Sequence, residues 1–190
     1  MNVFYLDKNP EIAAQMSCDK HVVKMILESA QLLSTCHRVQ DGTEYYDKTA
    51  NGRKIKRWKH PNSNMENVLY KAGWIKHPST VWLFESAYNY IWLYKHFMAL
   101  NEEYKKRYNH TKDHVAVQKL GDLLKFPPNN ASWNKIGTDA TPAMPEHCKV
   151  PGNSVQSYRN YYIIEKRRFA TWKAPAKTPE WYTQGVNNNV

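Results

Sequence analysis

The stretch from Asp19 to Leu33, "DKHVVKMILESAQLL", decides how this chain folds. Its apolar residues recur three and four positions apart, which is the spacing of an α-helix with one face in a protein core. We expect a helix that is capped by Ser17 or Asp19 and runs to about Arg38. The face in the core is expected to comprise Val22, Val23, Ile26, Leu27, Ala30 and Leu33.

The other side of this predicted helix carries a polar stripe. At about 100° per residue, the stripe spans roughly 80° of the helix surface. It consists of His21, Lys24, Glu28, Gln31 and Thr35. Lys24 and Glu28 are four residues apart and can form an ion pair. One interpretation is an ordinary ion pair on a solvated surface, worth a few tenths of a kcal/mol.

The alternative interpretation of the stripe is catalytic. A lysine amine can attack a sugar carbon and form an imine, and a neighbouring carboxylate can help a base to leave or move a proton. These two steps together describe a DNA glycosylase with lyase activity. Such an enzyme also needs a basic surface and aromatic side chains to hold a duplex and extrude a base.

The rest of the sequence predicts a mostly α-helical fold, in a single compact domain over residues 1–190. A short apolar arm is expected at residues 2–6, before helical sequence begins at 11–16. Residues 41–61 are expected to be irregular, with a possible hairpin turn at Asn51–Gly52. Further helices, separated by long irregular loops, are expected over residues 79–108, 112–126 and 153–173.

The charge of the chain points to a polyanionic partner. Lys and Arg number 27 against 17 Asp and Glu, which gives a formal net charge of +10. A surplus of this size is typical of nucleic-acid-binding proteins, although charge can also serve solubility alone. No secretory signal and no membrane-spanning run is evident, and the three cysteines are odd in number, so a reducing cytoplasm is expected.

Two cysteines lie close to a histidine in the sequence and are candidate ligands of a zinc site. Cys18 lies three residues before His21, and Cys148 follows His147. Structural zinc sites normally combine two closely spaced ligand pairs, and neither neighbourhood has that pattern. We therefore expect neither a metal nor an organic cofactor.

Two basic segments are candidates for nucleic-acid binding. In "RKIKRWKHP", cations alternate with an aromatic ring, which suits phosphates and a base or sugar face. Its candidates are Arg53, Lys54, Lys56, Arg57, Trp58, Lys59 and His60. The last predicted helix adds Arg159, Lys166, Arg167 and Arg168. For both segments the alternative is a solvated basic surface without a partner.

The order of these features resembles the small all-helical pyrimidine-dimer DNA glycosylase/AP lyases of phages, together with their uncharacterised bacterial relatives. That family opens with a short arm like "NVFYL", followed by a helix with a basic or His residue seven positions before a catalytic glutamate, as His21 precedes Glu28. A basic loop like "RKIKRWKHP", a "HP" element before a long aromatic helix and a capped basic helix with an aromatic tail follow in the same order.

The resemblance implies that Glu28 is the catalytic carboxylate and that the last helix packs near the site and contacts the DNA backbone. In the characterised enzymes the nucleophile is the α-amine of a small residue exposed by removal of the initiator Met. This chain departs from that pattern, because Asn2 is too large for efficient Met removal. The nucleophile is then the Met1 amine, the Asn2 amine or Lys24, unless the lyase step is absent.

The sequence is compatible with three functions. The first is an enzyme that cleaves the N-glycosidic bond of a damaged or modified pyrimidine in duplex DNA, with His21 orienting a phosphate or the carboxylate. The second is a non-catalytic nucleic-acid-binding protein. The third is a glycosidic-bond enzyme that acts on a nucleotide. For the first function we expect a monomer in the cytoplasm, that of the host cell if a phage encodes it.

Overall fold

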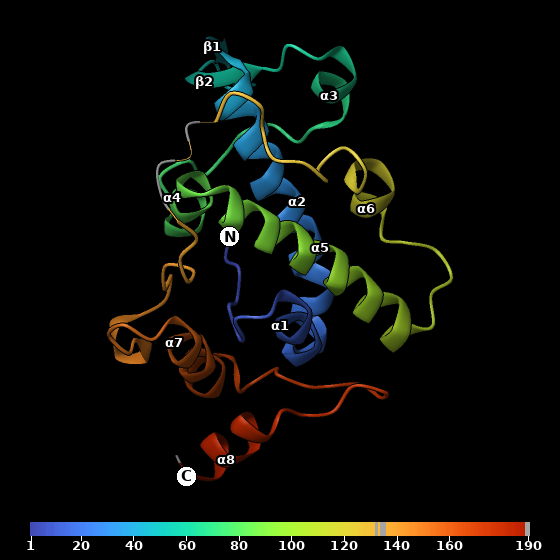
Figure 1. The fold of residues 1–190 in the computed structure, drawn as a ribbon, viewed down its shortest axis with the longest axis vertical. Helices are drawn as coiled ribbons and strands as arrows, with labels where there is room; N and C mark the ends of the chain where they lie inside the picture. The colour runs from blue at the N-terminus through green and yellow to red at the C-terminus, as the bar shows by residue number, and fades with distance from the viewer. Residues whose placement is uncertain (132, 134–135, 189–190) are drawn as a thin grey trace.

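The computed structural model describes residues 1–131, 133 and 136–188. It confirms the mostly α-helical fold, since the described residues form helices and one two-stranded sheet (Figure 1). The elements are α1 (Pro10–Met16), α2 (Asp19–Asp41), β1 (Thr43–Lys48), β2 (Lys54–Lys59), α3 (Ser63–Val68), α4 (Pro78–Glu85), α5 (Ala87–Tyr108), α6 (Val115–Leu120), η1 (Glu146–Cys148), α7 (Ser154–Tyr161), η2 (Tyr162–Lys166) and α8 (Glu180–Asn188).

Helix α2 is the central element, and the long helix α5 crosses it (Figure 1). The buried face of α2 is rotated about the helix axis from the predicted one. Val23 and Leu27 are exposed, whereas Met25 and Leu32 are fully buried. The rotation follows from packing, because α2 is covered by α4, α5 and α6 as well as by the N-terminal arm. As a result, Glu28 lies at the boundary between the buried and the exposed side of the helix.

The N-terminal arm forms no strand but is buried along its length, from Val3 to Leu6. Its backbone bends at Phe4, whose φ of 45° lies in the left-handed region, and Leu6 N–H donates to the Phe4 carbonyl (2.8 Å). Phe4 stacks on His21 of α2. As a result of this packing, the N-terminus lies in the middle of the molecule, beside α2 and α4 (Figure 1).

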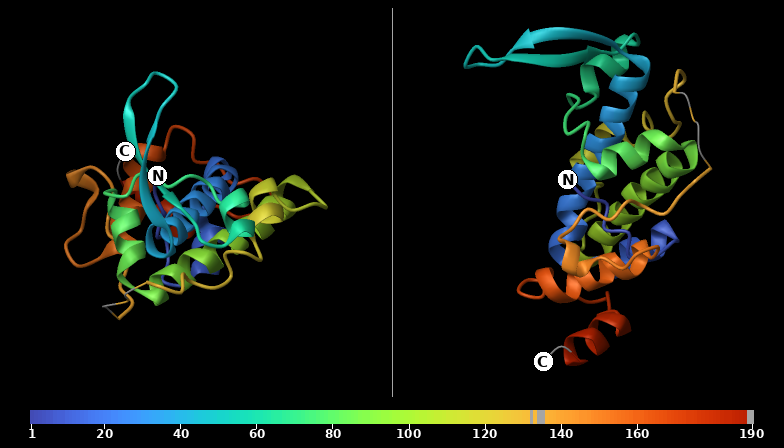
Figure 2. Two further views of the ribbon diagram at one scale, coloured as in Figure 1. Left: turned by 90° about the horizontal axis from the view of Figure 1, so that it is seen from above. Right: turned by 90° about the vertical axis from the view of Figure 1, so that its left-hand side faces the viewer.

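Residues 43–59 form an antiparallel β-hairpin where an irregular loop was predicted. The turn at Asn51–Gly52 is present, and Gly52 has a φ of 76°, which suits glycine. The hairpin projects away from the helices at the end of α2 (Figure 2). Most of its side chains are exposed, so the two-residue alternation that identifies strands in a sequence is weak here.

The predicted helix over residues 79–108 is two helices, because Ser86 adopts an extended conformation between α4 and α5. The Ser86 hydroxyl accepts from Tyr88 N–H (3.1 Å) and caps α5. The His77 side chain caps α4. The other predicted helices are shorter than expected, since α6 ends at Leu120 and α7 passes into the π-helical turn η2.

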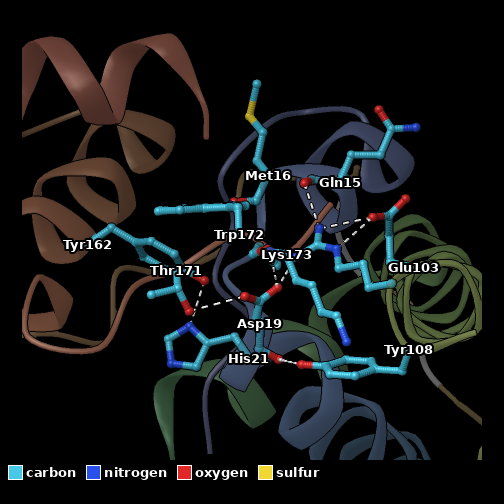
Figure 3. Close-up of polar contacts among 12 residues, drawn as sticks. Gln15, Met16, Asp19, His21, Glu103, Tyr108, Tyr162, Thr171, Trp172 and Lys173 are labelled. Carbon is cyan, nitrogen blue, oxygen red and sulfur yellow. Dashed lines mark hydrogen bonds and ion pairs between the residues drawn. The ribbon is translucent and has the colours of Figure 1, made fainter. Parts of the chain in front are cut away.

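A buried ionic network closes the other end of the core (Figure 3). Arg107 of α5 is fully buried and pairs with Glu103 (2.9 Å) and with Asp19 at the start of α2 (3.2 Å). The Asp19 carboxylate also accepts from Thr171 Oγ1 (3.1 Å) and Lys173 N–H (3.0 Å). The network thus ties α2 and α5 to the segment that precedes α8.

None of the helices within the described residues has the length and apolar character needed to cross a membrane.

Candidate active site

The carboxylate of Glu28 lies between two amines. The α-amine of Met1 is 3.9 Å from Oε2, and Lys24 Nζ is 3.2 Å from Oε1. The Glu28 side chain is 15% exposed and that of Lys24 is 67% exposed. The carboxylate is therefore mostly covered, whereas the lysine lies at the rim of the site. The predicted contact between Lys24 and Glu28 is therefore present, and the N-terminal arm adds a second amine to it.

Asn2 fixes the position of the Met1 amine. Its side-chain oxygen accepts from Val3 N–H (2.8 Å), and its side-chain nitrogen donates to the Ala143 carbonyl (2.8 Å). Both contacts are at buried or part-buried positions. The side chain of Asn2 thus anchors the arm, and its own polar atoms are occupied with this task.

His77 is a site residue that the sequence analysis did not select. Its Nδ1 accepts from Ser79 N–H (3.2 Å), which leaves the proton of the neutral ring on Nε2. Burial lowers the pKa of His77, the positive Met1 amine lowers it further, and the nearby Glu28 carboxylate opposes both effects. The "HP" dipeptide does indicate a capped helix start, but its proximity to Met1 and Glu28 arises only from the fold.

His21 lies on the stripe but is buried next to the site. Its Nδ1 lies 2.6 Å from the Tyr162 hydroxyl, and its ring stacks on Phe4 with centroids 3.9 Å apart. Burial lowers the pKa of His21 to about 3, with smaller contributions from Lys166 and Lys24. The ring is therefore neutral and supports the arm, and the structure pairs it with Tyr162 instead of with Glu28.

A basic hollow of about 390 Å³ adjoins Lys24 on one side of the site. Lys20 and Arg168 line it, with the Phe169 ring between them. The Lys20 Nζ lies 5.1 Å and the Arg168 guanidinium 5.7 Å from the centroid of that ring. The hollow combines cations and an aromatic surface within reach of Lys24.

A groove of about 840 Å³ lies on the other side, between the hairpin and the residues before α4. Strand β2 contributes Lys56 and Trp58 to it, and the facing wall comprises residues 74–78, which end with His77 and Pro78. Lys56 is paired with Glu44 across the hairpin (2.9 Å). The groove therefore lies between the basic hairpin and His77.

The remaining basic candidates of the hairpin occupy different positions. Arg53 lies in the turn and Lys54 at the start of β2, where both are exposed. Arg57 and Lys59 point to the face opposite Lys56 and Trp58, as alternation along the strand requires. His60 is buried, so the surface contact with DNA expected for it does not fit the fold.

The four basic residues predicted on the last helix also occupy different environments. Arg159 of α7 donates to the Leu6 carbonyl (3.0 Å) and supports the arm. Lys166 lies over the Tyr161 ring (4.1 Å), while Arg167 and Arg168 follow η2 and are exposed. Of these four, only Arg168 lines the basic hollow.

Two side-chain clusters within the described residues hold metal-ligand atoms within 4.8 Å of one another. In the buried cluster of His37, Asp41 and His60, Asn62 N–H donates to His60 Nδ1 (3.1 Å), which leaves the proton on the Nε2 that faces Asp41. A metal at Nε2 would require the other tautomer. We therefore assign this cluster the structural role of joining the hairpin to α2.

The second cluster consists of His147, Cys148 and Glu165. Its histidine and glutamate are exposed and bonded to each other (2.8 Å), and Cys148 is buried. Cys18 and His21 belong to no such cluster among the described residues, and the His21 ring is bonded to Tyr162.

One of three comparisons with known proteins found a match. Neither the search of curated proteins nor that of solved structures found a match. A family model described as pyrimidine dimer DNA glycosylase matches residues 1–115, a span that holds Met1, Lys24, Glu28 and His77. This span is more than half of the 190 residues and confirms the resemblance found in the sequence. The chain belongs to the pyrimidine dimer DNA glycosylase family.

Proposed function

We propose that this protein excises a damaged pyrimidine from duplex DNA and then cleaves the strand through an imine formed by the α-amine of Met1, with Glu28 as the acid and base. The observation that carries the proposal is the position of the Glu28 carboxylate, 3.9 Å from the Met1 amine and 3.2 Å from Lys24 Nζ. Membership of the family supports the glycosylase activity.

The chemistry needs one amine and one carboxylate. The neutral amine attacks C1′ of the sugar, the bond from C1′ to the base nitrogen breaks, and the base leaves with the electron pair and a proton. Loss of the amine proton and opening of the sugar ring give an imine between the amine nitrogen and C1′. Removal of a C2′ proton then expels the 3′ phosphate. In this scheme Glu28 passes the two amine protons on, one to the departing base and one to the ring oxygen as the ring opens, and the regenerated carboxylate then takes the C2′ proton.

Several observations favour the Met1 amine over Lys24 as the nucleophile. The Asn2 anchor holds the Met1 amine in one position, which reduces the entropy lost on reaching the reactive geometry. Lys24 is a long, exposed side chain, and lysine amines are intrinsically stronger bases than α-amines. Lys24 instead balances the charge of Glu28 and lies at the rim, where a phosphate would pass.

The surfaces on either side of Glu28 fit a DNA duplex. Lys20, Lys24 and Arg168 form one basic side, and the hairpin with Lys56 forms the other. Contacts of this kind neutralise phosphates and release counterions, so binding is expected to weaken steeply as salt is raised. The net charge of +10 supports a polymeric rather than a nucleotide substrate.

The test is borohydride trapping on a duplex with one abasic site, followed by mass mapping of the peptide that carries the sugar. We expect a trapped adduct on the N-terminal peptide of the wild type. Lys24→Gln should still trap at the same residue. Glu28→Gln should bind the duplex with wild-type affinity but lose at least a hundredfold in the rate of glycosidic-bond cleavage in a pyrimidine-dimer duplex.

The possible outcomes separate the proposal from its alternatives. An adduct that maps to Lys24 would reject Met1 as the nucleophile. Base release without any adduct would leave a glycosylase that lacks the lyase step. Salt-sensitive binding without glycosidic-bond cleavage would indicate a non-catalytic DNA-binding protein, and cleavage of that bond in free nucleotides but not in DNA would indicate the nucleotide enzyme.

A further inference from the structure

The cluster of His147, Cys148 and Glu165 is formed by two segments that the proposed reaction does not use. His147 and Cys148 belong to the short helix η1, and Glu165 belongs to η2, 18 residues after His147 in the chain. One ligand atom of each residue lies within 4.8 Å of those of the other two. The sequence spacing typical of structural zinc sites is absent here, because the third side chain comes from a separate segment.

The Cys148 thiol is fully buried at this cluster. The residue is 0% exposed, and within the described residues its sulfur makes no hydrogen bond. Burial raises the pKa of the thiol, the Glu165 carboxylate raises it further, and Lys166 opposes both effects. A thiol in this position is available to bind an ion, and it gives up its proton when it does so. The sulfur therefore forms the covered side of the cluster.

The two exposed members of the cluster can adjust to an ion. The His147 side chain is 57% and the Glu165 side chain 38% exposed, and His147 Nε2 lies 2.8 Å from Glu165 Oε1. Nitrogen and oxygen ligands of a tetrahedral zinc ion are about 3.3 Å apart, so this pair must open by only about half an ångström. Within the described residues His147 Nδ1 has no partner, in contrast to His60 Nδ1, so it can carry the ring proton when Nε2 binds an ion.

A π-helical turn brings Glu165 to His147. Helix α7 does not continue as an α-helix but passes into η2, the π-helix that contains Glu165. A π-turn holds more residues than an α-helical turn and therefore changes which side chains face a neighbouring segment. Such turns are rare and are often found at functional sites. The turn thus favours a ligand site independently of the buried thiol.

We propose that His147, Cys148 and Glu165 bind one zinc ion, with a water molecule as the fourth ligand. Thiolate, imidazole and carboxylate are all zinc ligands, whereas Mg²⁺ and Ca²⁺ prefer oxygen atoms alone. The thiolate and the carboxylate together balance the two charges of the ion. The ion joins η1 to η2, and Arg168 and Phe169, which follow η2, line the basic hollow. Because no residue of the cluster takes part in the proposed reaction, zinc binding can be tested separately from it.

The experiment titrates Zn²⁺ into chelator-treated protein without a histidine tag, at about pH 8, where free histidine is neutral. A competing zinc indicator reports the free ion. The proteins are the wild type, Cys148→Ser, His147→Gln, Glu165→Gln and the control His110→Gln, whose exposed histidine belongs to no such cluster among the described residues. We expect one ion per chain for the wild type and the control, and no competition from Mg²⁺. Each substitution in the cluster should weaken binding by more than about tenfold, since even residues that only support metal ligands change the affinity about 10–100-fold.

Cobalt tests the part played by the thiolate. Co²⁺ occupies zinc sites, and a bound thiolate gives it a charge-transfer absorption in the near ultraviolet. We expect this band in the wild type and in His110→Gln, and its loss in Cys148→Ser. Binding should also release one proton, from the thiol, which is measured as a heat of binding that depends on the buffer.

Thermal unfolding separates a lost ligand from a lost fold. Because His147 and Glu165 are exposed, His147→Gln and Glu165→Gln should melt at the wild-type temperature when no metal is present. Zinc at about a hundredfold excess over its dissociation constant should raise the melting temperature of the wild type by about 5–10 °C, and that of the two variants much less.

Three results would overturn the proposal. The first is a wild type that binds no zinc at micromolar concentrations of the ion. The second is an affinity that is unchanged in both His147→Gln and Glu165→Gln, which would place the ion elsewhere. The third is cobalt binding by the wild type without the charge-transfer band, which would exclude the Cys148 thiolate. These readouts decide the question even if Cys148→Ser does not fold.

Discussion

Replacing Arg107 with methionine should destabilise the protein severely. The guanidinium is fully buried and contacts the Glu103 and Asp19 carboxylates, together with the carbonyls of Ser17 (2.7 Å) and Gln15 (2.9 Å). Methionine fills a similar volume but leaves two carboxylates without their cation and two carbonyls without a donor. Removing one partner of a buried ion pair costs about 3–5 kcal/mol. For a chain of this length, that loss lowers the melting temperature by about 6–20 °C.

Urea unfolding followed by circular dichroism measures this free energy directly. Lys105→Met is the matched control, because Lys105 lies on the same helix but forms its ion pairs with Glu102 and Asp113 at the surface. The control should lose less than about 1 kcal/mol. A second substitution, Glu103→Leu in the Arg107→Met background, should recover part of the loss, since it removes one of the stranded carboxylates. Equal effects of Arg107→Met and Lys105→Met would refute the argument.

Three further predictions concern the arm, the acid stability and the break between α4 and α5. Asn2→Ala should slow borohydride trapping by about ten- to hundredfold with unchanged DNA affinity, because the Met1 amine loses its anchor; unchanged trapping would refute this. Burial lowers the pKa of His21 to about 3 and that of His96 to about 4, so below pH 6.5 the unfolded chain binds more protons than the folded one. The free energy of unfolding should therefore fall from pH 6.5 towards pH 4, by up to about 1.4 kcal/mol per pH unit for each histidine. Urea titrations at several pH values measure this dependence, which should be less steep in His96→Gln. Ser86→Ala should lose about 1 kcal/mol in the same assay, because the first turn of α5 loses its cap; Ser63→Ala, at an exposed position in α3, is the comparison.

The sequence predicted the elements whose signals are local. The spacing of apolar residues located α2, and the four-residue separation of Lys24 and Glu28 correctly placed their side chains together. In α7 the Asn153 side chain accepts from Gln156 N–H (3.0 Å), a cap that the three-residue spacing of Asn and Gln favours. Each of these features is decided within one or two helical turns, so the residues concerned are close in the sequence.

Features that depend on packing or on competition between neighbours were not predicted. An apolar pattern continues across Ser86, and nothing in that pattern reveals that the hydroxyl caps a new helix. The exposed, charged strands of the hairpin carry little alternation, because neither face is buried in a core. The approach of Met1 and His77 to Glu28 depends on how the arm and α4 pack on α2, and the packing is not encoded in any local spacing.

Two contacts that support the arm come from residues outside the span that the family model matches. The groups placed around Glu28 all lie within residues 1–115, whereas the Ala143 carbonyl, which holds Asn2, and Tyr162, which holds His21, lie beyond them. These later residues touch no group assigned to the chemistry, and their role is to fix the arm. Support of that kind can be provided by different side chains as long as the arm stays in place. Substitution of Tyr162 by phenylalanine should accordingly reduce trapping through the position of the arm, and a rate restored by a substitution elsewhere in the arm would identify the role as positional.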